Sequence, residues 1–120
     1  MIEALARERY ISLTTYKRDG TTASTPVWVV SDDGERLLVW SAATTWKVRR
    51  LRRDPRVLVA PCTFRGKERG ERREGRARVV DGVPIDALLR AKYGWQKRVL
   101  DVLNRSADPA SWVTVEIRAP

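Results

Sequence analysis

The first forty residues alternate between β-favouring segments and tight-turn signals, and this pattern restricts the fold more than any other feature of the sequence. The segments Arg9–Lys17, Thr22–Ser31 and Arg36–Ser41 are rich in aromatic, β-branched and leucine residues. They are separated by Asp19-Gly20 and Asp33-Gly34. Asp-Gly suits a tight hairpin because Gly accepts a positive φ. The pattern predicts three consecutive antiparallel strands, a meander.

The rest of the chain adds three strands and two helical insertions. We expect a helix from Thr44 or Thr45 to about Arg53, strands over Arg56–Phe64, Arg76–Asp81 and Trp112–Ile117, and a helical stretch over Ile85–Asn104 that Gly94 divides. Pro26 cannot donate to a sheet ladder, so its strand should lie at an edge or be bulged there. Six strands with short helices predict a mainly β fold, a small barrel whose closure removes exposed edges.

Length and composition set limits on the class of protein. The 120 residues fit one domain spanning 1–120, and 42% of them are apolar, which is ordinary for a folded chain. There is no His and one Cys. Serine-type triads, Cys-rich metal centres and internal disulfides are therefore not expected, and we expect no metal site. No signal peptide or membrane helix is expected either, which favours a cytoplasmic protein.

The positive charge is concentrated in one part of the chain. Between Lys47 and Arg78 there are thirteen basic and four acidic residues, so this window holds the whole formal net charge of +9. Such a concentration points to an anionic partner bound at one place. The excess of Arg over Lys also agrees with a GC-rich coding background, and that alternative stays open.

Two short segments carry residue types suited to ligand binding. At the expected helix start, Thr44 and Thr45 precede Lys47 and Arg50, and free backbone N–H groups with nearby cations suit a phosphate. The alternative is a solvated basic helix covering one end of the barrel. In Thr25–Trp28, a bulge at proline would present backbone groups to the edge of a flat heterocycle. Here an ordinary edge strand that contributes to the core is the simpler explanation.

Taken in order, the segments of this chain resemble one known family. The residues that carry the resemblance are Ser12-Leu-Thr-Thr, Asp19-Gly20, Thr25-Pro-Val-Trp28, Lys47-Val-Arg-Arg-Leu-Arg-Arg-Asp-Pro55, Ala60-Pro-Cys62, Arg65-Gly66 and Lys92-Tyr-Gly-Trp95. The chain resembles the split β-barrel flavin and deazaflavin oxidoreductases of the pyridoxamine 5'-phosphate oxidase class, and within them the branch that binds coenzyme F420. The resemblance implies a six-stranded FMN-binding split barrel that forms a homodimer, with the cofactor in a cleft between subunits.

The resemblance also implies roles for individual residues. It implies that Lys47 and Arg50, with the hydroxyls of Thr44 and Thr45, hold the cofactor phosphate. The ring system would lie along Thr25, Pro26 and Val27, with Ser41 near its polar edge. Arg65 and the loop to Arg73 would meet the acidic tail of F420. The first strand begins close to residue 1, which is early for the family and makes a helical lid from that end unexpected.

The implied function is hydride transfer between F420 and a small organic substrate that the sequence does not identify. The cofactor supplies the difficult chemistry, so the lack of His is no obstacle. Tyr16, Cys62 and Tyr93 are possible proton donors. An FMN-dependent enzyme of the pyridoxine-phosphate oxidase type is the alternative within the fold. A cofactor carrier and a nucleic-acid-binding barrel remain as other classes, the latter disfavoured because acidic residues interrupt the basic window.

Overall fold

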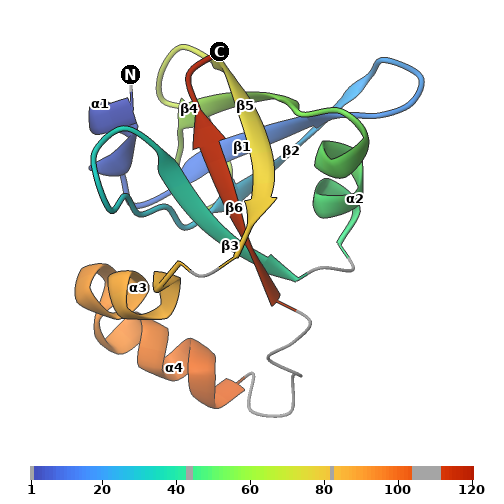
Figure 1. Ribbon diagram of the computed structural model, residues 1–120. Coiled ribbons are helices and arrows are strands. Elements are labelled where there is room, and N and C mark those ends of the chain that lie inside the picture. The colour runs from blue at the N-terminus through green and yellow to red at the C-terminus, as the bar shows by residue number, and fades with distance from the viewer. Residues whose placement is uncertain (1, 43–44, 82, 104–111) are drawn as a thin grey trace.

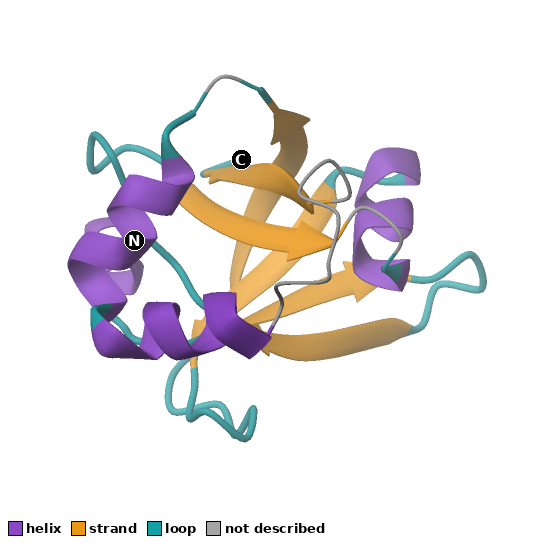
Figure 2. Cartoon of the chain, turned by 90° about the horizontal axis from the view of Figure 1, so that it is seen from below, coloured by secondary structure: helices purple, strands orange, loops and turns teal. Residues whose placement is uncertain are grey.

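The computed structural model describes residues 2–42, 45–81, 83–103 and 112–120, and it shows one curled antiparallel sheet of six strands. The strands are β1 (Ile11–Tyr16), β2 (Thr22–Val27), β3 (Leu37–Ala42), β4 (Arg56–Pro61), β5 (Arg73–Val80) and β6 (Trp112–Arg118). Their order in the sheet is β2-β1-β4-β5-β6-β3. The sheet forms a half-barrel, with helices grouped at its ends (Figures 1 and 2), so the mainly β split-barrel prediction is confirmed.

The predicted meander is wrong at its third strand. β3 does not join the β1–β2 hairpin; it pairs along its length with β6 at the opposite edge of the sheet. Between the two edges there is one bridge, in which Val30 and Leu38 exchange backbone hydrogen bonds of 3.0 and 2.8 Å. The ladder does not extend because β2 ends at Val27, and the backbone of Val29 bonds to side chains of a helix instead.

Pro26 lies on an edge strand, as its missing N–H predicts. β2 is the first strand of the sheet and pairs only with β1, where Pro26 stands opposite Ser12. A proline also ends β4, at Pro61, three residues before the predicted end. β5 begins three residues earlier than predicted, because Arg73 and the next residues pair with the first half of β4 despite their charge.

The interior of the half-barrel holds the larger of two apolar clusters. Alternate residues of β1, β3, β4, β5 and β6 point inward, such as Ile11 and Leu13 of β1, and Val57 and Val59 of β4. A smaller cluster on the outer side joins β3 to a helix, through Leu38 and residues around Leu89. The two faces of β3 therefore serve two different cores.

The helices that the structure describes cover the ends of the sheet. They are α1 (Ile2–Ala6), α2 (Trp46–Arg53), α3 (Ile85–Tyr93) and α4 (Trp95–Leu103). α1 is not predicted by the sequence pattern because it has little more than one turn, yet Ile2 and Leu5 are buried in the main core. The predicted break at Gly94 is confirmed: this glycine ends α3 with a φ of +55°. α3 and α4 pack together, away from α2 (Figure 2).

Candidate ligand-binding site

The first turn of α2 begins without a side-chain cap. Thr45 is the N-cap residue, but its hydroxyl donates to the carbonyl of Ala42 at 2.8 Å and lies 3.3 Å from the hydroxyl of Ser41. The Thr45 side chain therefore does not cap the helix, and no other described side chain accepts a hydrogen bond from its first amides. Such amides are donors for an anion.

An apolar cavity of about 260 Å³ lies where β2, β3, β6, α2 and α3 meet. Its lining consists of Pro26, Val27, Trp28, Trp40, Ser41, Ala42, Thr45, Lys47, Leu89 and Trp112. The rings of Trp40 and Trp112 are 4.8 Å apart. Lys47 is the charged residue of this lining, and burial lowers the pKa of its ammonium. A cavity of aromatic walls with one cation at its edge suits a flat ring that carries an anionic group.

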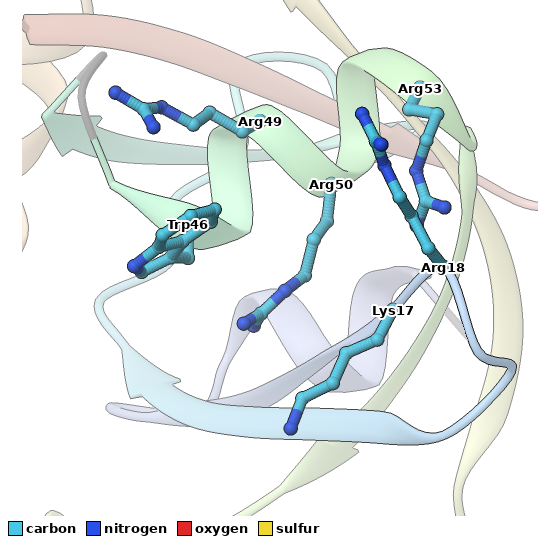
Figure 3. Close-up of a pocket in the computed structure, with 6 residues that line it drawn as sticks. All are labelled: Lys17, Arg18, Trp46, Arg49, Arg50 and Arg53. Carbon is cyan, nitrogen blue, oxygen red and sulfur yellow. The ribbon is translucent and has the colours of Figure 1, made fainter.

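A second pocket, of about 410 Å³, lies on the neighbouring side of α2 and is strongly basic (Figure 3). We call it the basic pocket; it is lined by Lys17, Arg18, Trp46, Arg49, Arg50 and Arg53. The first two come from the turn after β1 and the others from one face of α2. The guanidinium of Arg49 lies 5.1 Å from the centre of the Trp46 ring, and Arg53 donates to the carbonyl of Tyr16.

The five cations of the basic pocket differ from most other arginines of the chain. Within the described ranges, no carboxylate forms an ion pair with any of them. By contrast, Arg69 pairs with Glu8, Arg72 with Glu68 and Arg73 with Glu71. Three arginines of the loop that was expected to meet an acidic tail thus have carboxylate partners, whereas Arg65 of that loop lies against the Phe64 ring. Among the described residues, five cations without an ion pair gather at the basic pocket.

The structure brings together five of the nine residues that the sequence singled out. Those that line the apolar cavity are Pro26, Val27, Ser41, Thr45 and Lys47. Arg50 lies in the basic pocket instead. Thr25 is exposed on β2, and Arg65 is exposed in the turn after β4 with its guanidinium 5.4 Å from the Phe64 ring; neither lines the two pockets. Thr44 lies outside the described residues.

Sequence reasoning missed most of the aromatic wall and part of the basic pocket. Trp40 pairs with Thr114 and Trp112 pairs with Ala42 in the β3–β6 ladder, so the two rings are diagonal neighbours. No spacing rule predicts this contact, because the two strands are far apart in the chain. Lys17 and Arg18 reach the basic pocket through the hairpin turn. The helical spacing of Trp46, Arg49, Arg50 and Arg53 is the signal that was available, and these residues do share one face.

The three residues considered as proton donors are not part of the lining of the apolar cavity. Cys62 is buried, and burial together with Glu68 raises the pKa of its thiol. Burial raises the pKa of Tyr93 to about 12, although a backbone hydrogen bond from Val29 opposes this. Tyr16 has the guanidinium of Arg56 stacked 4.8 Å from its ring. None of the three lines the cavity.

Comparisons with known proteins give one family and one fold. The family model for pyridoxamine 5'-phosphate oxidase matches residues 1–119. No curated protein matches the chain.

Among the helices that the structure describes, none has the length and apolar character needed to cross a membrane.

Solved structures with the same fold include proteins of different function. An F420 reductase is 23% identical with a TM-score of 0.61, over 98% of this chain and 92% of that one. A FAD-binding protein from Mesorhizobium loti is 22% identical with a TM-score of 0.60, over 96% and 82% of the two chains. A heme storage protein from Vibrio cholerae is 12% identical with a TM-score of 0.65, over 95% and 83%. At these identities the likeness shows the fold alone.

Proposed function

We propose that this chain is an F420-dependent oxidoreductase that transfers hydride between this cofactor and a small organic substrate. The chain belongs to the pyridoxamine 5'-phosphate oxidase family. Structural neighbours of the chain include an F420 reductase and a FAD-binding protein. A flavin-like ring is therefore the kind of ligand that the fold accommodates elsewhere, and the choice among such cofactors depends on this chain's own residues.

The observation that carries the proposal is the position of two unlike pockets on either side of the start of α2. Thr45 and Lys47 belong to the apolar cavity, and Trp46 between them belongs to the basic pocket. F420 combines a flat ring, a phosphate and a tail of several carboxylates. The tryptophan-lined cavity fits the ring, Lys47 and the first amides of α2 fit the phosphate, and the five cations of the basic pocket fit the tail.

In this proposal the protein binds the cofactor, orients its ring and shields the ring from water. F420, when bound, supplies the hydride from its deazaflavin ring. The walls formed by Trp28, Trp40 and Trp112 would fix the plane of that ring and exclude water from one side of it. Lys47 would hold the phosphate, and the backbone of β2 beside Pro26 would face the edge of the ring. No described side chain of the cavity is a carboxylic acid or a thiol, so proton transfer is not assigned to this lining.

The proposal includes a cytoplasmic homodimer with the cofactor cleft between its subunits. It is supported by the family resemblance and by the position of β2, whose outer edge has no partner strand among the described residues. Light scattering during size-exclusion chromatography tests it: we expect a mass near twice 13.7 kDa, and a monomer would contradict this part of the proposal.

FMN is the alternative cofactor, since one phosphate needs only Lys47 and the start of α2. The two are separated by Arg49→Gln combined with Arg50→Gln, which removes two charges from the basic pocket. Two partly exposed cations near an anion contribute about 1.4 kcal/mol together, so F420 affinity should fall about tenfold. FMN affinity should change little.

The matched control is Arg52→Gln, which removes an exposed charge of α2 that lines neither pocket. Its affinity for F420 should equal that of the wild type within about twofold. Equal F420 affinities for the double variant and the control would contradict the role of the basic pocket.

A further inference from the structure

Two neighbouring side chains at the end of α3, those of Lys92 and Tyr93, bond to the backbone of residues 6–9 and of Val29. The ammonium of Lys92 donates to the carbonyls of Ala6, Glu8 and Val29 at 2.8, 2.6 and 2.6 Å. The hydroxyl of Tyr93 accepts from the amide of Val29 at 2.9 Å and lies 2.7 Å from the carbonyl of Arg9, to which it donates. We call these two side chains the α3 clamp.

The α3 clamp replaces strand pairing at a point where the sheet has ended. β2 stops at Val27, and Val29 has no ladder partner, although its side chain is fully buried. A buried backbone amide or carbonyl without a partner costs about 1–3 kcal/mol. Tyr93 satisfies the amide of Val29 and Lys92 satisfies its carbonyl, so these side chains determine the path of the chain just after β2.

The same tyrosine ring supports one wall of the apolar cavity. Tyr93 stacks on Trp28 with 4.2 Å between ring centres and 9° between planes. Trp28 lines the cavity, whereas Lys92 and Tyr93 do not. Tyr93 is 1% exposed, so the core fixes its ring. Any influence of the clamp on a ligand in the cavity therefore passes through Trp28 and the backbone on its C-terminal side.

We propose that Lys92 and Tyr93 are positioning residues for the apolar cavity, which set the plane of the Trp28 ring against which a flat cofactor ring packs. The ligand part of this inference rests on the proposed function; the contacts of the clamp with Trp28 and Val29 do not. An ammonium has three donors, and here all three are used by carbonyls, so no neutral side chain of similar length reproduces the arrangement.

Two substitutions separate the components of the clamp. Tyr93→Phe keeps the stacked ring but removes the hydroxyl bonded to Val29 and Arg9. Lys92→Met keeps most of the side-chain length but removes all three donors. Lys67→Met is the matched control, since Lys67 is exposed and its side chain lines neither the cavity nor the clamp.

The binding experiment uses F420 and FMN as ring probes and inorganic tripolyphosphate as a probe of the basic pocket. For both clamp variants we expect at least about fivefold weaker binding of the ring probe that the wild type binds, which corresponds to about 1 kcal/mol. Tripolyphosphate affinity should stay unchanged, because no clamp residue lines the basic pocket. Unchanged ring affinity, or equal loss of both kinds of probe, would overturn the proposal.

A second measurement needs no cofactor and so separates this inference from the proposed function. The indole N–H resonance of Trp28 is assigned in proton–nitrogen spectra with Trp28→Phe. It should move in both clamp variants and stay in place in Lys67→Met, while the resonance of exposed Trp46 stays in place throughout. If the wild type bound neither ring probe, the proposed function would fail, and a Trp28 resonance unmoved in both variants would overturn the clamp.

The pH dependence of the Trp28 resonance distinguishes a lysine that positions the Trp28 ring from one that only stabilises the fold. Burial lowers the pKa of Lys92 to about 8, with a further lowering by Arg9 and an opposing effect of Glu8, the charged side chains that act on it. The Trp28 resonance should therefore titrate with a midpoint near pH 8 in the wild type. It should show no such step in Lys92→Met, and a step retained in that variant would count against the proposal.

Discussion

Glu116 lies at the centre of a network of three arginines on the outer face of the sheet. Replacing it tests how strongly these ion pairs stabilise the fold. Its carboxylate, whose side chain is 3% exposed, pairs with Arg36 at 2.7 Å, Arg78 at 2.9 Å and Arg118 at 3.1 Å. Burial alone would raise its pKa. The hydrogen bonds from the three arginines outweigh burial and lower the pKa to about 2.

The shift of the pKa sets the size of the expected effect. A fall from 4.5 to about 2 corresponds to about 3 kcal/mol of preference for the charged carboxylate in the folded state. Arg78 and Arg118 are 70% and 47% exposed, so water screens part of their attraction. We therefore expect Glu116→Gln to lower the free energy of unfolding by about 2 kcal/mol at pH 7.

Urea denaturation of the wild type and Glu116→Gln measures this difference. The control is Glu74→Gln, because Glu74 is exposed on β5 and forms no ion pair with a described residue; its unfolding free energy should match the wild type within about 0.5 kcal/mol.

The dependence on pH gives a second check on the same variant. A carboxyl whose folded pKa is depressed stabilises the fold above its unfolded pKa, and this stabilisation is lost as pH falls toward the folded value. The difference between Glu116→Gln and wild type should thus shrink between about pH 5 and pH 2. A difference below about 0.5 kcal/mol at pH 7, or one that does not change with pH, would show that the three arginines do not stabilise the Glu116 carboxylate in the folded state.

Three further substitutions test other parts of the structure. Lys47→Ala should weaken cofactor binding about tenfold in a fluorescence titration while the melting temperature stays within a few degrees, and unchanged affinity would contradict the phosphate role. Thr15→Val should raise the unfolding free energy by up to about 1 kcal/mol in urea, because the buried hydroxyl of Thr15 has no hydrogen-bond partner among the described residues. Gly70→Ala should lower the melting temperature, since the Cβ of the new alanine would lie 2.7 Å from the ring of Pro61. An unchanged melting temperature would mean that the loop moves to relieve this contact at no cost in stability.

Local signals predicted most elements of the fold, and distant pairing decided the rest. The Asp19-Gly20 turn, the edge position of Pro26 and the break at Gly94 follow from the chemistry of single residues, and all three are found. The place of β3 does not follow from such signals. Its paired residues in β6 lie about seventy to eighty positions later in the chain. Just beyond β2, the backbone of Val29 bonds to Tyr93 and Lys92 and not to a strand.

For the candidate site too, the sequence predicted the residues that are close together in the chain but not those that distant strand pairing brings in. Residues close in sequence to the start of α2, such as Ser41, Thr45 and Lys47, do meet in one cavity. Trp112 joins them only through the β3–β6 ladder. The charge window predicted an anionic partner but not its place, because whether an arginine is free depends on folding: Arg69 finds Glu8 from sixty-one residues away, whereas Arg50 finds no described carboxylate.

The proposed function requires that this chain bind F420 in preference to other anionic ligands. Quenching of tryptophan fluorescence in the purified chain, titrated in parallel with F420, FMN and a single-stranded oligonucleotide, tests it most directly, since Trp28, Trp40 and Trp112 line the cavity. We predict saturable quenching by F420 at lower concentration than by FMN, and weak binding of the oligonucleotide. Tight binding of FMN without binding of F420, or oligonucleotide binding that falls steeply with salt, would contradict the claim.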